Sequence, residues 1–229
     1  SLKNTAFPFE FNDFKKLVEI TKKHDIGVIK MEVFRNVKPK NDFLKKIRNL
    51  ASKKNIILIF DECTSGFREN FGGLHLKYGV APDIAIFGKA LGNGHAITAV
   101  LGKKEIMQHA QDSFISSTFW TERSGPAAAL KTLEIMERKK SWNIISRLGK
   151  KIKQGWVSLA KKHQLKIKIF GLSSICSFEI QSPNWLKYKT LISQEMIKKG
   201  FLAANSVYVC IDHNEKIIKK YLKNLDDIF

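Results

Sequence analysis

The sequence has no long apolar run and few cysteines. A membrane-spanning helix needs about 20 consecutive apolar residues, and no apolar stretch of this 229-residue chain approaches that length. Residues 1–16 also lack the basic and then apolar order of a signal peptide. The three cysteines, Cys63, Cys176 and Cys210, are an odd number without CxxC spacing. This usage is typical of reduced thiols, so we expect a cytoplasmic protein without membrane segments, and we identify no metal site.

Acidic residues are scarce beside basic ones. The chain has 21 Asp and Glu against 40 Lys and Arg, a formal net charge of +19. Such an excess can indicate a nucleic-acid-binding protein. However, the lysines are spread over the whole length, and within 43–54 they alternate with apolar residues at helical spacing. That pattern is typical of a solvated helix face behind a buried stripe, so we favour solvated faces and keep polyanion binding as an alternative.

Helices and short apolar strands alternate along the first part of the chain. Strands are predicted over 26–33, 55–60, 83–88 and 96–102, and helices over 12–23, 41–54, 103–110 and 125–139. Asn12 is predicted to cap the first helix. Continuous apolar strands separated by helices are typical of an α/β fold with a mostly parallel sheet.

The pattern changes near residue 140. A long amphipathic helix is predicted over 141–163, then strands within 165–180 and 201–210, and helices over 184–199 and from 214. Two or three strands with flanking helices indicate a small α+β domain. We therefore predict two domains, 1–140 and 141–229.

Two strand ends carry residues suited to chemistry. Asp61 and Glu62 follow the strand ILIF, and Lys89 follows the strand IAIF and Gly88. Without a chemical role, Asp61 and Glu62 would be a helix cap or a surface pair, and Lys89 would be an ordinary surface lysine. A Walker B strand is excluded, since Ala90 follows Gly88-Lys89 and no phosphate-binding GxxxxGK[ST] loop exists. If the strands are parallel neighbours, Asp61 and Lys89 meet in one crevice, the pair that pyridoxal 5'-phosphate (PLP) chemistry requires.

The segment DECTSGFRENFGGLHLKYGVAPDIAIFGKALGNG, residues 61–94, resembles the signature of class III aminotransferases. These are PLP-dependent enzymes of fold type I, and the branch that it most resembles contains glutamate-1-semialdehyde aminomutase. The resemblance runs from about residue 31 to the C-terminal helix. It implies that 1–140 is the C-terminal part of the PLP-binding large domain and that 141–229 is the small C-terminal domain.

The resemblance also implies roles for single residues. Lys89 would be the Schiff-base lysine and the proton shuttle, and Asp61 the partner of the pyridine nitrogen. Cys63 replaces the usual valine that packs on the ring face and keeps a small, soft side chain. Thr121 corresponds to a threonine that reaches the cofactor phosphate of the neighbouring subunit, so the resemblance implies a homodimer. Glu32 matches a family glutamate.

Two departures from the family pattern matter. The family's first half, with its phosphate-binding turn and ring-stacking aromatic, is not in this sequence, so we expect it elsewhere on a longer protein or on a separate chain. Asn205 falls where the aminomutase has a glutamate, in an alignment that runs through His213. We therefore expect amino transfer between an amino donor and a carbonyl acceptor rather than the mutase reaction. A non-catalytic remnant that serves as an interaction module stays an alternative.

Overall fold

The computed structural model describes residues 3–119 and 121–229. Contacts between residues divide the chain into two compact units, Ser1–Glu134 and Ile135–Phe229. Helix α4, Ser124–Lys139, runs across this division, and α5 begins after it at Ser141. The sequence prediction placed its domain boundary at the junction of these two helices. Among the described residues, no helix combines the length and apolar character needed to cross a membrane.

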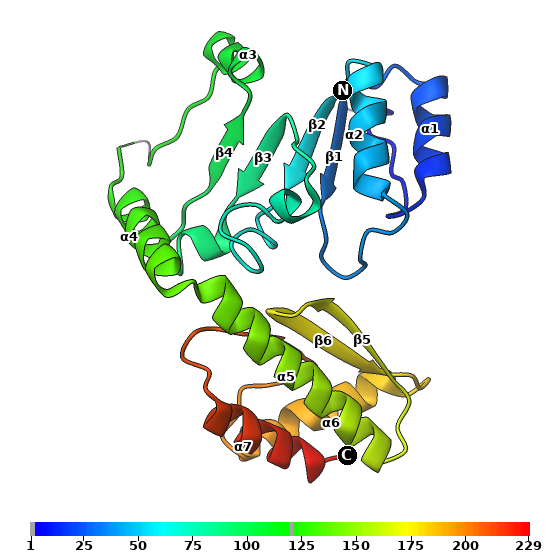
Figure 1. Cartoon of the computed structure of the whole chain (residues 1–229), viewed down its shortest axis with the longest axis vertical. Coiled ribbons are helices and arrows are strands. Elements are labelled where there is room, and N and C mark those ends of the chain that lie inside the picture. The colour runs from blue at the N-terminus through cyan, green and yellow to red at the C-terminus, as the bar shows by residue number, and fades with distance from the viewer. Residues whose placement is uncertain (1–2, 120) are drawn as a thin grey trace. The chain divides into compact units, whose positions relative to one another are not determined.

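The first unit is built on a four-stranded sheet (Figure 1). Its strands, in spatial as well as chain order, are β1 (Val28–Glu32), β2 (Ile57–Asp61), β3 (Ile84–Phe87) and β4 (Ala99–Gly102). The first three strands are parallel, and β4 runs antiparallel to β3. The predicted α/β fold with a mostly parallel sheet is confirmed.

The first helix of this unit begins at a capping side chain, whereas the next two have no side-chain cap. The sheet is accompanied by α1 (Phe14–Lys23), α2 (Phe43–Lys53), α3 (Lys104–Met107) and three short 3-10 segments, η1 (Leu74–Tyr78), η2 (Lys89–Leu91) and η3 (Gln108–Asp112). The cap of α1 was predicted wrongly, because Asp13 and not Asn12 accepts the Lys16 amide. The Asn12 side chain instead bonds the backbone of residues 38 and 40.

Only one face of the sheet is buried. Its apolar side chains include Ile29, Leu58, Phe60 and Phe87, all at most 6% exposed. Helix α2, which contacts β2, covers part of this face with its own buried stripe. The side chains between them in sequence lie on the other face and are half-buried or exposed, as in the alternating pattern of β2. Asp61 belongs to this more open face.

The second unit is an α+β domain with an antiparallel sheet. Strands β5 (Ile167–Leu172), β6 (Ile175–Ile180) and β7 (Ser206–Tyr208) follow that order in space. Its helices are α5 (Ser141–Lys162), α6 (Trp185–Lys198) and α7 (Glu215–Asp226). Trp156 is fully buried at the centre of the core, 4.9 Å from the Phe178 ring. Its indole N–H donates to the Tyr221 hydroxyl at 3.0 Å, which satisfies a buried polar group.

Candidate active site

Asp61 lies at the carboxyl end of β2, on the open face of the sheet. Its Oδ1 accepts the Cys63 amide at 3.2 Å, and its Oδ2 lies 3.1 Å from the Lys30 ammonium. Partial burial raises the pKa of Asp61, but the hydrogen bonds from Lys30 and Cys63 and the Lys30 charge outweigh it, so the pKa is lowered. Asp61 is therefore an ionised carboxylate at neutral pH.

Lys89 begins η2, directly after β3 and Gly88. Its backbone φ is 48°, in the left-handed region that residues other than glycine rarely adopt. Its ammonium donates to the buried Thr64 hydroxyl at 2.6 Å. A non-glycine residue held in such a conformation is a recurring feature of functional sites. The turn thus fixes the backbone of Lys89, while Thr64 orients its amine.

Cys63 connects these two residues electrostatically. Burial raises the pKa of its thiol, the Asp61 charge raises it further, and the charges of Lys89 and Lys30 act in the opposite direction. Because β2 and β3 are parallel neighbours with Asp61 opposite Ile86, the ends of both strands reach the same sheet edge. A Cβ added to Gly88 would lie 3.4 Å from the Cys63 sulfur, so the chain before Lys89 passes close to Cys63.

Glu62 has a different place from its neighbour Asp61. Its side chain is fully buried and accepts the Ser65 hydroxyl, the His75 amide at 2.8 Å and, at 2.9 Å, a hydrogen bond with His75 Nδ1. These bonds hold the loop between β2 and β3 in shape. The carboxylates of the ILIFDE segment are thus separated, one on the open face and one inside the loop.

The structure also gives the positions of the other residues that the sequence analysis singled out. Glu32 pairs with Asp61 in the strand register, and its carboxylate lies 3.5 Å from Arg35. Val33, the next residue, is fully buried. Thr121 lies on an exposed segment just before α4. Contact of Thr121 with a neighbouring subunit therefore stays a prediction.

Sequence reasoning missed two polar side chains at this centre. Thr64 stands within the quoted signature, but its hydrogen bond to Lys89 depends on how the loop folds back. Lys30 had a visible signal, because it is a lysine in the middle of the apolar segment IGVIKMEV. Alternation along the strand could have placed it on the face that carries Asp61.

Comparison with known proteins decides the family. Residues 36–214 match the family model described as aminotransferase class-III. The chain belongs to this family. It is 39% identical to the 3-aminobutyryl-CoA aminotransferase of Cloacimonas acidaminovorans over 63% of this chain and 37% of that protein. It is 28% identical to the glutamate-1-semialdehyde 2,1-aminomutase of Methanocaldococcus jannaschii over 99% of this chain and 58% of that protein. The chain thus spans roughly half the length of these relatives.

Solved structures show the same fold. The FumI protein of a Sphingopyxis species, a PLP form, matches 97% of this chain and 56% of its own with a TM-score of 0.91 and 21% identity. The ornithine aminotransferase of Plasmodium yoelii matches all of this chain and 63% of its own with a TM-score of 0.84 and 18% identity. Class III aminotransferases are PLP-dependent, and the chain has the fold of fold-type-I transaminases.

The donor set at the sheet edge fits the aldehyde and ring parts of PLP. The amine of Lys89 suits an aldehyde, the ionised Asp61 suits a ring N–H, and Cys63 offers a small, soft side chain beside Asp61. A Cβ at Gly88 would lie 3.3 Å from the Thr98 methyl and 3.4 Å from the Cys63 sulfur, so a larger residue there would press on Thr98 and contact Cys63. Among the described residues, no cluster of three or more His, Cys, Asp or Glu could hold a metal ion.

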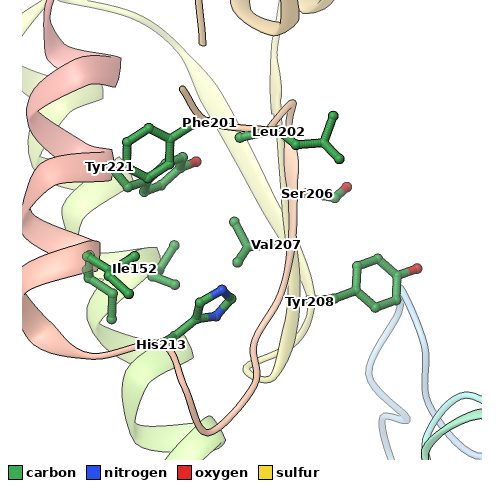
Figure 2. A pocket seen from close by; sticks show the side chains of 11 residues that line it. Ile152, Phe201, Leu202, Ser206, Val207, Tyr208, His213 and Tyr221 are labelled. Carbon is green, nitrogen blue, oxygen red and sulfur yellow. The ribbon is translucent and has the colours of Figure 1, made fainter. Parts of the chain in front are cut away.

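The second unit contains a cavity of its own, of about 300 Å³ (Figure 2). Apolar side chains form most of its wall, and the figure shows the His213 ring turned toward Val207 while Tyr208 extends away. The Cys210 amide donates to His213 Nδ1 at 3.3 Å, which leaves the ring hydrogen of a neutral His213 on Nε2. His213 thus serves the turn before α7. Asn205 donates its side-chain amide to the Phe178 carbonyl at 3.0 Å, a strand contact.

Proposed function

We propose that this chain is the lysine-bearing part of a PLP-dependent aminotransferase that moves an amino group between an amino donor and a carbonyl acceptor. One observation supports this most directly: from two adjacent parallel strand ends, Asp61 accepts the Cys63 amide at 3.2 Å and Lys89 donates to the Thr64 hydroxyl at 2.6 Å, so both contact the same two-residue segment. An amine and a carboxylate at one sheet edge, beside a small side chain, are the groups that a pyridine aldehyde needs. Membership of the class III family supports the same conclusion.

Each residue has a separate task in this proposal. PLP, when bound, supplies an aldehyde carbon and a ring that takes up electrons. Lys89 would hold the cofactor at its aldehyde carbon until the amino donor takes its place there, and its amine would then take the donor's Cα proton and return it at the C4′ atom. Thr64 orients the lysine amine, Asp61 holds the ring nitrogen protonated, and Cys63 packs on the ring face. These roles are proposals.

The neutral side chain of Asn205 favours amino transfer over the mutase reaction. Its side chain is engaged with the β6 backbone and carries no charge, whereas the aminomutase pattern has a glutamate at that position. We therefore propose amino transfer from a small-molecule amino donor to a small-molecule carbonyl acceptor.

The complete enzyme is proposed to include polypeptide beyond these residues. The phosphate-binding turn of the family belongs to its first half, and Thr121 is the residue proposed to serve the phosphate of a neighbouring subunit. We therefore propose a homodimer in which each site takes residues from two subunits. The first half is either part of a longer protein or a separate chain.

The test is covalent fixation of the cofactor. The chain is incubated with millimolar PLP, reduced with borohydride and digested, and mass spectrometry locates the modified lysine. We expect Lys89 to carry most of the adduct, and Lys89→Ala to lose it with an unchanged circular dichroism spectrum. Lys77→Ala, which removes an exposed lysine paired with Glu69, is the matched control and should leave the adduct in place.

Three outcomes would contradict the proposal. An adduct spread evenly over the exposed lysines would mean that Lys89 has no special reactivity. Salt-sensitive binding of nucleic acid together with no fixation at Lys89 would favour the polyanion-binding alternative. Fixation at Lys89 without turnover, even after the first half is supplied, would favour a non-catalytic interaction module.

A further inference from the structure

Lys30 is a charged residue in the middle of the strand β1. It stands in β1 between Ile29 and Met31, which are at most 9% exposed and face the core, so its own side chain lies on the open face. From there its ammonium reaches Oδ2 of Asp61, at 3.1 Å, across the boundary between β1 and β2. The Lys30 side chain is 56% exposed and that of Asp61 25%.

We propose that Lys30 is a built-in cation that competes with the ring nitrogen of PLP for the Asp61 carboxylate and thereby weakens binding of the protonated ring. The inference rests on the proposed function of Asp61. Lys30 would act on the cofactor only through Asp61, and the reaction itself does not require it.

The contacts of Asp61 explain why the two would compete. Oδ1 already accepts the Cys63 amide, whose position is fixed by the backbone, and Oδ2 faces Lys30. A ring N–H would need one of these oxygens. Lys30 is the partner that can move, because its long side chain is more than half exposed. Even after it moves, two cations beside one carboxylate repel each other.

Other charges near Asp61 do not provide the same effect. Lys89 acts on Cys63 from the β3 side, but its amine is engaged with Thr64 and is the group proposed to bind the aldehyde. The Cys63 amide is neutral and remains in either state. Glu32, opposite Asp61 in the strand register, is a carboxylate with Arg35 as its own partner. Among the described residues, Lys30 is thus the cation that forms an ion pair with Asp61, at 3.1 Å.

The first measurement needs no cofactor. The Asp61 carboxyl carbon is titrated by NMR, with Asp61→Asn to assign its signal. In Lys30→Met the pKa of Asp61 should rise from its wild-type value, because one hydrogen bond and one positive charge are lost. Lys30→Arg keeps the charge and should titrate like wild type. Lys16→Met removes an exposed lysine paired with Glu19 on α1 and should also leave the pKa unchanged.

The second measurement is PLP binding by absorbance titration of the same variants. Lys30→Met should bind PLP more tightly by roughly threefold, the scale of an exposed ion pair, and keep the ring protonated to higher pH. Circular dichroism checks the fold of each variant, and Lys30→Gln replaces Lys30→Met if the latter is unfolded.

Each result decides between the two proposals. An unchanged Asp61 pKa in the neutral Lys30 variants overturns the inference. Equal or weaker PLP binding by these variants overturns it too, while the proposed function stands. Absence of PLP binding in every variant, also after the first half is supplied, overturns the proposed function together with the competition that depends on it. A raised Asp61 pKa with tighter PLP binding supports both.

Discussion

Asp83, the aspartate of the YGVAPD segment, is expected to stabilise the first unit and to take no part in chemistry. Its carboxylate side chain is 6% exposed and lies at the start of β3. Oδ2 accepts the Arg48 guanidinium and the Leu58 amide, each at 2.8 Å, and Oδ1 lies 2.8 Å from the Lys103 ammonium. Asp83 thereby ties β3 to α2, to β2 and to the segment after β4.

The magnitude for Asp83→Asn follows from these contacts. Asparagine keeps one acceptor for the Leu58 amide but loses the charge that faces Arg48, which is 18% exposed. A hydrogen bond to a charged, mostly buried group contributes about 1.5–3 kcal/mol. Lys103 is half-exposed, and a pair of that kind contributes less than about 1 kcal/mol. We expect the free energy of unfolding of the first unit to fall by about 2–3 kcal/mol.

Hydrogen exchange is the assay, because it reports on each unit separately. Protection of the β2 segment, which contains the Leu58 amide, should fall by roughly 30- to 150-fold in Asp83→Asn. Lys103→Ala is the matched control, with a loss below about fivefold. A loss below about threefold in Asp83→Asn, or an equal loss in the control, would refute this account of Asp83.

The dependence on pH gives a second check. Burial raises the pKa of Asp83. The hydrogen bonds from Leu58, Lys103 and Arg48 lower it by a larger amount, so the pKa lies below the ordinary 3.8. A group with a lowered pKa in the folded state stabilises above its unfolded pKa and loses this contribution as pH falls through the folded pKa. The difference in stability between wild type and Asp83→Asn should therefore be full at neutral pH and shrink below about pH 3.8.

Three further changes test other parts of the chain. Gly149→Ala would place a Cβ 1.8 Å from the Ser173 carbonyl oxygen, so thermal melting followed by tryptophan fluorescence should show the second unit destabilised by about 3 kcal/mol or more. Asp61→Asn should cut turnover of the complete enzyme at least about tenfold, or 1.4 kcal/mol in the barrier, while borohydride still fixes PLP to Lys89. Mixing Lys89→Ala chains with Thr121→Val chains should restore one intact site per mixed dimer, and activity equal to the sum of the separate variants would argue against a shared site.

The strands were predictable because each is a short apolar run between helices. The segments 55–60 and 83–88 became β2 and β3 with small shifts at their ends. The antiparallel direction of β4 was not predictable, because direction depends on the connection after β3 and not on apolar content. The predicted helix over 103–110 is α3 followed by the 3-10 segment η3, a tighter geometry that periodicity alone cannot distinguish.

The candidate site was predictable in part. The order of strands and the family resemblance were enough to single out Asp61 and Lys89. The separation of Asp61 from Glu62 needed the structure, since both are carboxylates at a strand end and only the loop fold buries Glu62. The contact of Thr64 with Lys89 likewise depends on a loop conformation that no local pattern specifies.

The alternation of side chains across the sheet links these observations. Ile29, Leu58 and Phe60 point to the buried face, so Lys30 and Asp61, one position further along, must point to the other. A shift of β1 by one residue would bury Lys30 in the core and separate it from Asp61. The core thus fixes the register, and the register sets which charges meet on the open face. Any polypeptide that covers this face in the complete enzyme would reduce solvent around Lys30 and Asp61, and would thereby strengthen the competition between Lys30 and a bound ring.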